Sequence, residues 1–315
     1  MTSRAETVWE GGRFDAREGP AKVLFGRMYE DAAIELGAFR PGGRIFTIAS
    51  AGCTAMALSR HHEVVAVDIN PIQLAYARRR FGGDPGGPGL AERVMAWGRT
   101  AFSFVGWRPP CLRAFLDLEE PKAQIAFWRR HLDTPAFRAL WGALFSMAAL
   151  RTVYASPFLS FLPKHWGTVL RRRMERTFSR HPNRANPYAE RLLLGTSPDE
   201  PSAREETATQ FVCADAASYL EGQGPGSFDG FSLSNILDGA DRAYEGRLFE
   251  AVRRTARPGA VVVLRSFREP EVMLRTNHAD WDRSMLWGVV DVRPAADLPR
   301  DPELHHHGRL SLRMN

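Results

Sequence analysis

Residues 43–80, GRIFTIASAGCTAMALSRHHEVVAVDINPIQLAYARRR, contain two β-forming apolar runs, each followed by a helix-forming segment. The first run, Arg44–Ala49, leads into a turn of small residues at 50–52. The second run, Val64–Val67, ends in Asp68. The order of strand, turn, helix, strand, acidic residue and helix predicts the first half of a nucleotide-binding α/β domain.

The chemistry of this segment indicates which ligand it would take. Small residues in the turn let a ligand approach the backbone, and Asp68 at a strand tip can accept from both hydroxyls of a ribose. Ala51 and Ala55 stand where a dinucleotide fingerprint favours glycine, which disfavours a close pyrophosphate. S-adenosylmethionine has no phosphate, so the pattern favours a class I S-adenosylmethionine site. The alternative is an α/β turn with no ligand.

Composition indicates an ordinary soluble globular protein, since 44% of the 315 residues are hydrophobic and 25% are charged. The N-terminal residues MTSRAETVWE lack the apolar core of a secretory signal, and the longest apolar run, Ala139–Leu150, is too short to span a bilayer. Cys53, Cys111 and Cys213 form no CxxC pair, which favours a reduced compartment. We therefore expect a cytoplasmic protein, or one peripheral at the inner membrane surface.

The α/β pattern is interrupted between about residues 82 and 207. The break begins with the turn-rich stretch GGDPGGPG at 82–89, and helical segments follow. In Pro135–Leu150, apolar residues recur at helical spacing, with Thr134 as the expected N-cap. The sequence therefore predicts a Rossmann-like domain, formed by 1–81 and 208–315, with a mainly helical insertion at 82–207 that faces the acceptor or a membrane.

The insertion also holds the basic part of the chain. Lys164–Arg191 alone carries a net charge of +6, which equals the net charge of the whole protein. A helix expected near His165–Arg180 has one apolar side (Trp166, Val169, Leu170, Met174 and Phe178) and a basic side (Arg171, Arg172, Arg173 and Arg176). Such a helix can lie on an anionic membrane surface; the alternative is a solvated face of a helix that packs on the core. Nucleic acid is a weaker expectation, because no recognised binding module is present.

The strand pattern returns after residue 208, with predicted strands at 209–214, 228–233, 260–264, 288–292 and 309–313. Polar residues follow or end most strands of the predicted sheet: Ser50, Asp68, Asp215, Ser234, Asn235 and Arg265. In a doubly wound sheet these tips lie on one edge, which carries the ligand crevice. Their convergence predicts a ligand site there.

Several strings of this chain resemble the betaine-lipid aminocarboxypropyltransferase family. They are FTIASAGC, AVDINPIQLA, LDLEEPKAQIAFWRRHLDTPAFRALWGALFS, RHPNRANPYAERLLLG and LSNILD, and the resemblance runs from about Gly26 to Leu286. Characterised members transfer the 3-amino-3-carboxypropyl group of S-adenosylmethionine to diacylglycerol. This chain looks shorter, like a compact branch. The resemblance implies S-adenosylmethionine as cofactor and a lipid or another hydroxyl compound as acceptor.

The resemblance also implies positions for the cofactor. The residues implied are Ser50, Ala51 and Gly52 at the turn, Asp68 and Asn70 at the ribose, Asp215 at the adenine amine, Ser234 and Asn235 beneath the sulfonium, and Tyr29, Glu30 and Asp31 over the amino-acid end. Asp215 and Asn235 have an alternative role as helix caps. An aminocarboxypropyltransferase must turn Cγ toward the acceptor, and Arg265 and Arg283 are implied to bind the carboxylate of the transferred group.

The reaction is a displacement at sulfonium, in which alignment and exclusion of water supply most of the rate. An alcohol acceptor would also benefit from a base, and the candidates are His181, Tyr188 and Asp238. Each has a structural alternative, as a surface residue, a loop anchor or a turn cap. No metal is expected, because His305–His307 are adjacent and lack partners with ligand spacing.

Three other functions compete with aminocarboxypropyl transfer. An ordinary methyltransferase would use the same core and release S-adenosylhomocysteine in place of methylthioadenosine. A non-catalytic sensor would bind S-adenosylmethionine and an anionic membrane without turnover. A nucleic-acid-modifying enzyme would bind RNA or DNA with strong salt dependence.

Overall fold

A six-stranded sheet forms the centre of one lobe in the computed structural model, which describes residues 22–153, 159, 162–196, 209–270 and 275–300. The strand order is β3-β2-β1-β4-β5-β6. The first five strands run parallel, and β6 is antiparallel to β5. This is a class I methyltransferase-like Rossmann sheet with a helical insertion after the second strand-helix unit, as predicted.

The strands and helices of the sheet lobe follow the predicted segments closely. They are α1 (Ala33–Ala38), β1 (Arg44–Ile48), α2 (Cys53–Leu58), β2 (Glu63–Asp68), α3 (Pro71–Phe81), β3 (Thr209–Cys213), α12 (Ala216–Glu221), β4 (Phe228–Ser232), α13 (Arg242–Thr255), β5 (Ala256–Ser266), β6 (Val289–Pro294) and the 3-10 turn η3 (Ala295–Asp297). β5 is longer than predicted, because its pairing with β4 shifts register around Gly259, which has a positive φ of 82°. The predicted strand at 309–313 and His305–His307 lie outside the described residues.

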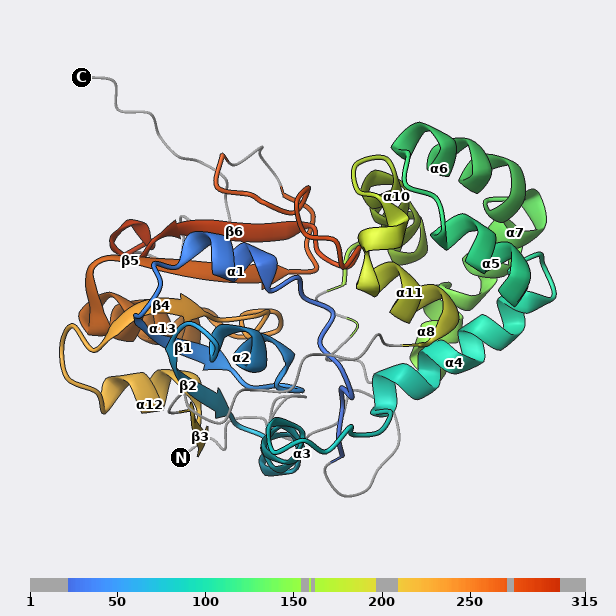
Figure 1. Cartoon of the computed structure of the whole chain (residues 1–315). Helices are drawn as coiled ribbons and strands as arrows, with labels where there is room; N and C mark the ends of the chain where they lie inside the picture. Colours follow the sequence, from blue (N-terminus) through green and yellow to red (C-terminus); the bar gives the residue numbers. More distant parts are fainter. Residues whose placement is uncertain (1–21, 154–158, 160–161, 197–208, 271–274, 301–315) are drawn as a thin grey trace.

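The insertion forms a second lobe beside the sheet (Figure 1). Its elements are α4 (Leu90–Ser103), α5 (Pro109–Leu116), α6 (Pro121–Phe127), the π-helical turn η1 (Trp128–Leu132), α7 (Pro135–Leu144), α8 (Met147–Val153), α10 (Trp166–Phe178), the 3-10 turn η2 (Asn183–Ala185) and α11 (Pro187–Leu194). None of the helices in the described ranges is long and apolar enough to cross a membrane.

Three helices begin with a polar N-cap residue followed by proline. Asn70, Thr134 and Asn186 each precede a proline, and each side chain accepts a hydrogen bond from an amide of the first helical turn. Proline at the first helical position loses no hydrogen bond, because that amide has no partner within the helix. The N-cap role predicted for Thr134 is therefore confirmed.

One predicted helix is two helices in the structure. The segment Pro135–Leu150 breaks between Leu144 and Met147, because the Ser146 hydroxyl accepts from the amide of Ala149 at 3.2 Å. A serine side chain that satisfies a free amide starts a new helix rather than continuing the old one. Phe137 and Trp141 of the first helix are buried, as the apolar spacing predicted.

Helix α10 joins the two lobes. Its Trp166 and Val169 pack into one core of the sheet, and its Met174 and Phe178 pack into the core of the insertion. The apolar side predicted for this helix is therefore inside the protein. A helix whose apolar side is already buried cannot insert that side into a membrane.

The basic side of α10 differs from the prediction at one residue. Arg173 has only 3% of its side chain exposed, and its guanidinium donates to the carbonyl oxygens of Phe267 and Leu286 and pairs with Glu269. Arg173 was predicted on the basic side, which would face a membrane or solvent; for this residue that prediction was wrong. A helical wheel cannot detect this, because the acceptors come from a loop about a hundred residues further along the chain.

Removing an aromatic side chain from the insertion core should strongly destabilise the protein. Phe178→Ala should lower the free energy of unfolding by about 3 to 5 kcal/mol, because Phe178 is fully buried among aromatic neighbours. Phe104→Ala is the matched control. Phe104 is 84% exposed, so its loss should change stability by no more than about 0.5 kcal/mol. Urea unfolding of both variants measures the difference, and equal effects would contradict the packing described.

Candidate functional site

The candidate site lies at the carboxyl edge of the sheet, where the strand order reverses between β1 and β4. Two residues after each of these strands ends, a serine has left-handed backbone: φ is 42° at Ser50 and 50° at Ser234. Non-glycine residues rarely adopt this conformation, and such residues cluster at ligand sites. Gly52 also has a positive φ, of 85°, where glycine has no steric penalty. The backbone is thus sharply turned on both sides of the crevice.

Asp68 faces the turn after β1. Its carboxylate accepts from the Ser50 amide at 2.8 Å and from the Asn70 amide at 2.9 Å. Burial raises the pKa of Asp68 to about 6, although both amide hydrogen bonds act in the opposite direction. At neutral pH the group is mostly a carboxylate, held at the tip of β2 beside the turn.

The turn at 50–52 packs against helix α3. Ala51 is fully buried, and a Cβ at Gly52 would lie 3.4 Å from the Cβ of Ala77. The Arg80 guanidinium donates to the Ala51 carbonyl oxygen and to the Cys53 sulfur. Small residues at this turn therefore serve the packing of α3 beneath it.

Asn70 and Gln73 connect this turn to the segment before α1. The Asn70 amide group donates to the carbonyl oxygen of Lys22 while its oxygen caps α3. Gln73 donates to the carbonyl oxygens of Ser50 and Phe25 and accepts from the amide of Leu24. Sequence reasoning missed Gln73. Its signal is a polar residue in an inward-facing position of a helix.

At the tips of β3 and β4, side chains take cap and turn roles. Asp215 accepts from the Ser218 amide at 2.8 Å, which is the N-cap alternative for that residue. Asn235 accepts from the Ser234 hydroxyl at 3.4 Å and donates to Asp238 at 3.4 Å. These contacts place Ser234, Asn235 and Asp238 in one group after β4.

Glu30 is the buried acid of the site. The Ser234 hydroxyl donates to Glu30 Oε1, and the Tyr188 hydroxyl donates to the Glu30 carbonyl oxygen at 2.7 Å. Glu30 Oε2 is buried and receives no hydrogen bond within the described part of the chain; Nη1 of Arg265 lies 3.6 Å away. Burial raises the pKa of Glu30 to about 7, and Arg265 offsets part of that effect.

Arg265 was predicted to lie in the ligand crevice, but in the structure its side chain does not face that crevice. Its side chain is fully buried, and its guanidinium contacts both oxygens of Glu35, the Asp282 carboxylate, the Glu30 carboxylate and the Asp31 carbonyl oxygen. Burial alone would lower the pKa of Arg265, but Glu35, Glu30 and Asp282 raise it well above its usual value. A guanidinium has five N–H donors, and this one makes four hydrogen bonds to protein acceptors besides its ion pair with Glu30. The prediction that Arg265 binds a substrate carboxylate was therefore wrong.

Arg283 is more accessible. Its guanidinium forms a two-point ion pair with Asp31, at 2.5 and 2.8 Å, and also donates to the Ala185 carbonyl oxygen. Burial alone would raise the pKa of Asp31, but the pair with Arg283 lowers it below its usual value. With 31% of its side chain exposed, Arg283 lies where the first segment meets the insertion.

Tyr29 and Tyr188 belong to the same junction. The Trp287 indole donates to the Tyr29 carbonyl oxygen at 2.8 Å, and the Arg191 guanidinium lies over both tyrosine rings. Burial raises the pKa of Tyr188 well above its usual value. A neutral phenol that already donates to Glu30 cannot accept a proton, so the prediction of Tyr188 as a base was wrong and its anchoring alternative holds.

The other two predicted bases are tied to structural partners. A ring nitrogen of His181 lies 2.9 Å from the Asp280 carbonyl oxygen. Asp238 accepts from the Ser266 hydroxyl at 2.6 Å and the Phe267 amide at 3.0 Å, and its burial raises its pKa. Asp238 thus connects the turn after β4 to the end of β5. Within the described ranges, no group of three or more His, Cys, Asp or Glu side chains could hold a metal ion.

Comparison with known proteins gives only distant likenesses. No protein-family model and no curated protein matches the chain, so its resemblance to the betaine-lipid family stays a prediction. Among solved structures, it is similar to a precorrin 8w decarboxylase from Methanobacterium thermoautotrophicum, at 8% identity over 78% of this chain with a TM-score of 0.31. The match spans 63% of that protein's length. It is also similar to an rRNA methyltransferase from Streptomyces viridochromogenes, at 12% identity over 84% of this chain and 82% of that one, with a TM-score of 0.32. Neither likeness bears on substrate or reaction.

Replacing Arg265 should unfold the protein rather than only weaken a ligand contact. Arg265→Met should cost about 3 to 5 kcal/mol of stability, because Glu35 and Asp282 would be left buried without their countercharge. Arg184→Met removes an exposed pair with Glu119 and should cost about 0 to 1 kcal/mol. Chemical unfolding distinguishes the two. A folded Arg265→Met protein with wild-type stability would overturn the structural role.

Proposed function

We propose that this protein is an S-adenosylmethionine-dependent transferase that moves the 3-amino-3-carboxypropyl group to a hydroxyl of a diacylglycerol-type lipid and releases methylthioadenosine. The observation that carries the proposal is Asp68 at the tip of β2, hydrogen-bonded to the left-handed Ser50 of the turn after β1. A strand-tip carboxylate beside a sharp small-residue turn suits a ribose diol and its nucleoside. Asp215 after β3 caps α12 through Oδ1, and its other carboxylate oxygen would accept from the adenine amine.

The amino-acid end of the cofactor would lie against the segment before α1. Glu30 Oε2 is a buried carboxylate oxygen with no hydrogen bond in the described residues, and it lies beside Ser234 at the tip of β4. An α-ammonium group would supply the missing donor. Arg283 is paired with Asp31 of the same segment, is partly exposed, and would bind the carboxylate.

The insertion would hold the acceptor. Tyr188 and Arg191 of α11 donate to the carbonyl oxygens of Glu30 and Met28, so this helix lies directly against the segment assigned to the amino-acid end. The acceptor oxygen would attack Cγ, the Cγ–S bond would break, and its electron pair would stay on sulfur. The hydroxyl proton would leave to a base or to water. Because a neutral thioether departs readily, alignment supplies most of the rate.

The nucleoside product distinguishes aminocarboxypropyl transfer from methyl transfer. Purified protein incubated with S-adenosylmethionine and a total lipid extract should yield methylthioadenosine and a lipid that has gained the aminocarboxypropyl mass, both measured by mass spectrometry. Asp68→Ala should abolish the product, whereas Asp117→Ala, at an exposed position of the insertion, should leave it unchanged. S-adenosylhomocysteine in place of methylthioadenosine would mean a methyltransferase. Neither nucleoside, with the cofactor still bound, would favour a binding protein.

Glu30→Gln tests the assignment of the ammonium group. We expect affinity for S-adenosylmethionine to fall by about tenfold or more, because a charge-assisted hydrogen bond is lost. Affinity for methylthioadenosine, which has no amino-acid end, should stay unchanged and so report that the nucleoside site is intact. Calorimetric titration with both ligands measures this. Equal losses for the two ligands would mean that Glu30 acts only on the fold.

A further inference from the structure

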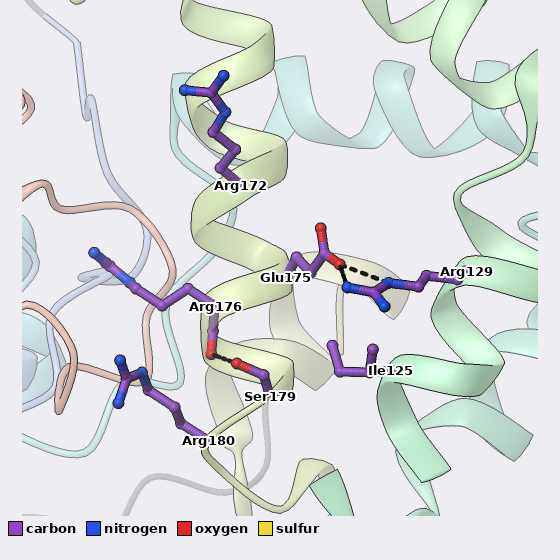
Figure 2. A pocket seen from close by; sticks show the side chains of 7 residues that line it. All are labelled: Ile125, Arg129, Arg172, Glu175, Arg176, Ser179 and Arg180. Carbon is purple, nitrogen blue, oxygen red and sulfur yellow. Dashed lines mark hydrogen bonds and ion pairs between the residues drawn. The ribbon is translucent and has the colours of Figure 1, made fainter. Parts of the chain in front are cut away.

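A second concave surface lies on the insertion, away from the carboxyl edge of the sheet. It is a hollow of about 500 Å³ between α10 and the α6–η1 pair. Its lining residues are Ile125, Arg129, Arg172, Glu175, Arg176, Ser179 and Arg180. Figure 2 shows Arg172 and Arg176 on successive turns of α10, Arg180 just after the helix ends, and Arg129 reaching across from η1 to Glu175.

Positive charge exceeds negative charge around this hollow. Arg129 pairs with Glu175 at 2.6 Å, and Arg176 and Arg180 share Asp280 at 3.5 and 2.8 Å. Arg172 is exposed, and no hydrogen-bond acceptor or carboxylate contacts it among the described residues. Four guanidinium groups thus face two carboxylates, so the hollow has an excess of two positive charges.

The like charges of neighbouring arginines on α10 destabilise this helix. Arg172 and Arg176 are four residues apart on α10, so their like charges lie next to one another on one side, and Arg180 follows just after the helix ends. Like charges at this spacing destabilise a helix by a few tenths of a kcal/mol per pair. The apolar side of α10 is buried, so the helix cannot turn these side chains apart. An anion in the hollow would remove the repulsion.

We propose that this hollow binds a phosphate group, either of an anionic phospholipid headgroup or of a soluble phosphate ester. Guanidinium groups match phosphate in geometry, because each can donate two parallel hydrogen bonds to its oxygens. Arg172 offers donors that no described residue uses, and Arg129 and Arg180 are more than half exposed and can turn toward a ligand. The site is separate from the nucleoside crevice and goes beyond the proposed transfer reaction.

The first experiment uses inorganic phosphate as the probe. Thermal unfolding of the full chain is followed with increasing phosphate, against chloride at the same ionic strength. Phosphate should raise the melting temperature of the wild type, because a ligand that binds only the folded state stabilises it. In Arg172→Gln/Arg180→Gln the apparent Kd should be weaker by about tenfold or more.

A matched control removes the same number of charges elsewhere. Arg184→Gln/Arg247→Gln alters two exposed, ion-paired arginines outside the hollow and should keep the wild-type response. Arg172→Gln alone is the second variant. Its side chain is exposed and has no hydrogen bond or ion pair with the described residues, so the variant should fold normally and still weaken phosphate binding.

The second experiment identifies the source of the phosphate. Cosedimentation compares vesicles of phosphatidylcholine with vesicles that also contain phosphatidylglycerol. Binding to the anionic vesicles that the Arg172→Gln/Arg180→Gln variant loses and the control retains indicates a lipid headgroup. A response to inorganic phosphate with the same variant dependence, but no vesicle binding, indicates a soluble ester. Equal behaviour of wild type, variant and control in both experiments would overturn the proposal.

Discussion

The buried ion-pair cluster around Arg265 is the interaction on which the site depends. It joins the end of β5 to Glu35 of α1, to Glu30 before that helix and to Asp282 in the loop before β6. A buried guanidinium is tolerated only when acceptors surround it, so its charge determines where three separate segments lie. Through Glu30, the same cluster holds Ser234 at the tip of β4. The shape of the crevice therefore depends on a group that does not face it.

The insertion is tied to this crevice by hydrogen bonds between the lobes. Tyr188 and Arg191 of α11 donate to the backbone of the segment before α1, and Arg173 of α10 donates to the loop after β5. These polar contacts supplement the apolar packing of Trp166 and Val169 on the sheet. A lobe attached in this way lies against the segment before α1, where the proposed cofactor site would be. It can also hold its own basic hollow on a different surface.

Local patterns in the sequence predicted much of the sheet and one side of the site. Short β-forming runs, turns of small residues and polar caps act through neighbours within a few positions, and the strands at 44–48, 63–68 and 209–213 follow from them. Asp68 was predictable because parallel strands bring their carboxyl ends to one edge. The roles of Tyr188 and Arg265 were not predictable, because Glu30 and Glu35, with which they pair, lie more than 150 residues away.

The sequence by itself determined the alternation of strands and helices, the position of the helical insertion and the strand-tip residues Ser50, Asp68 and Ser234. Each depends on spacing along the chain. Only the tertiary structure decided that Arg265 is a buried countercharge, that the apolar side of α10 lies in two cores, and that Glu30 meets Ser234. The physical reason is that burial and charge pairing are properties of segments brought together by folding. A pattern read along one segment contains no information about which distant groups surround it.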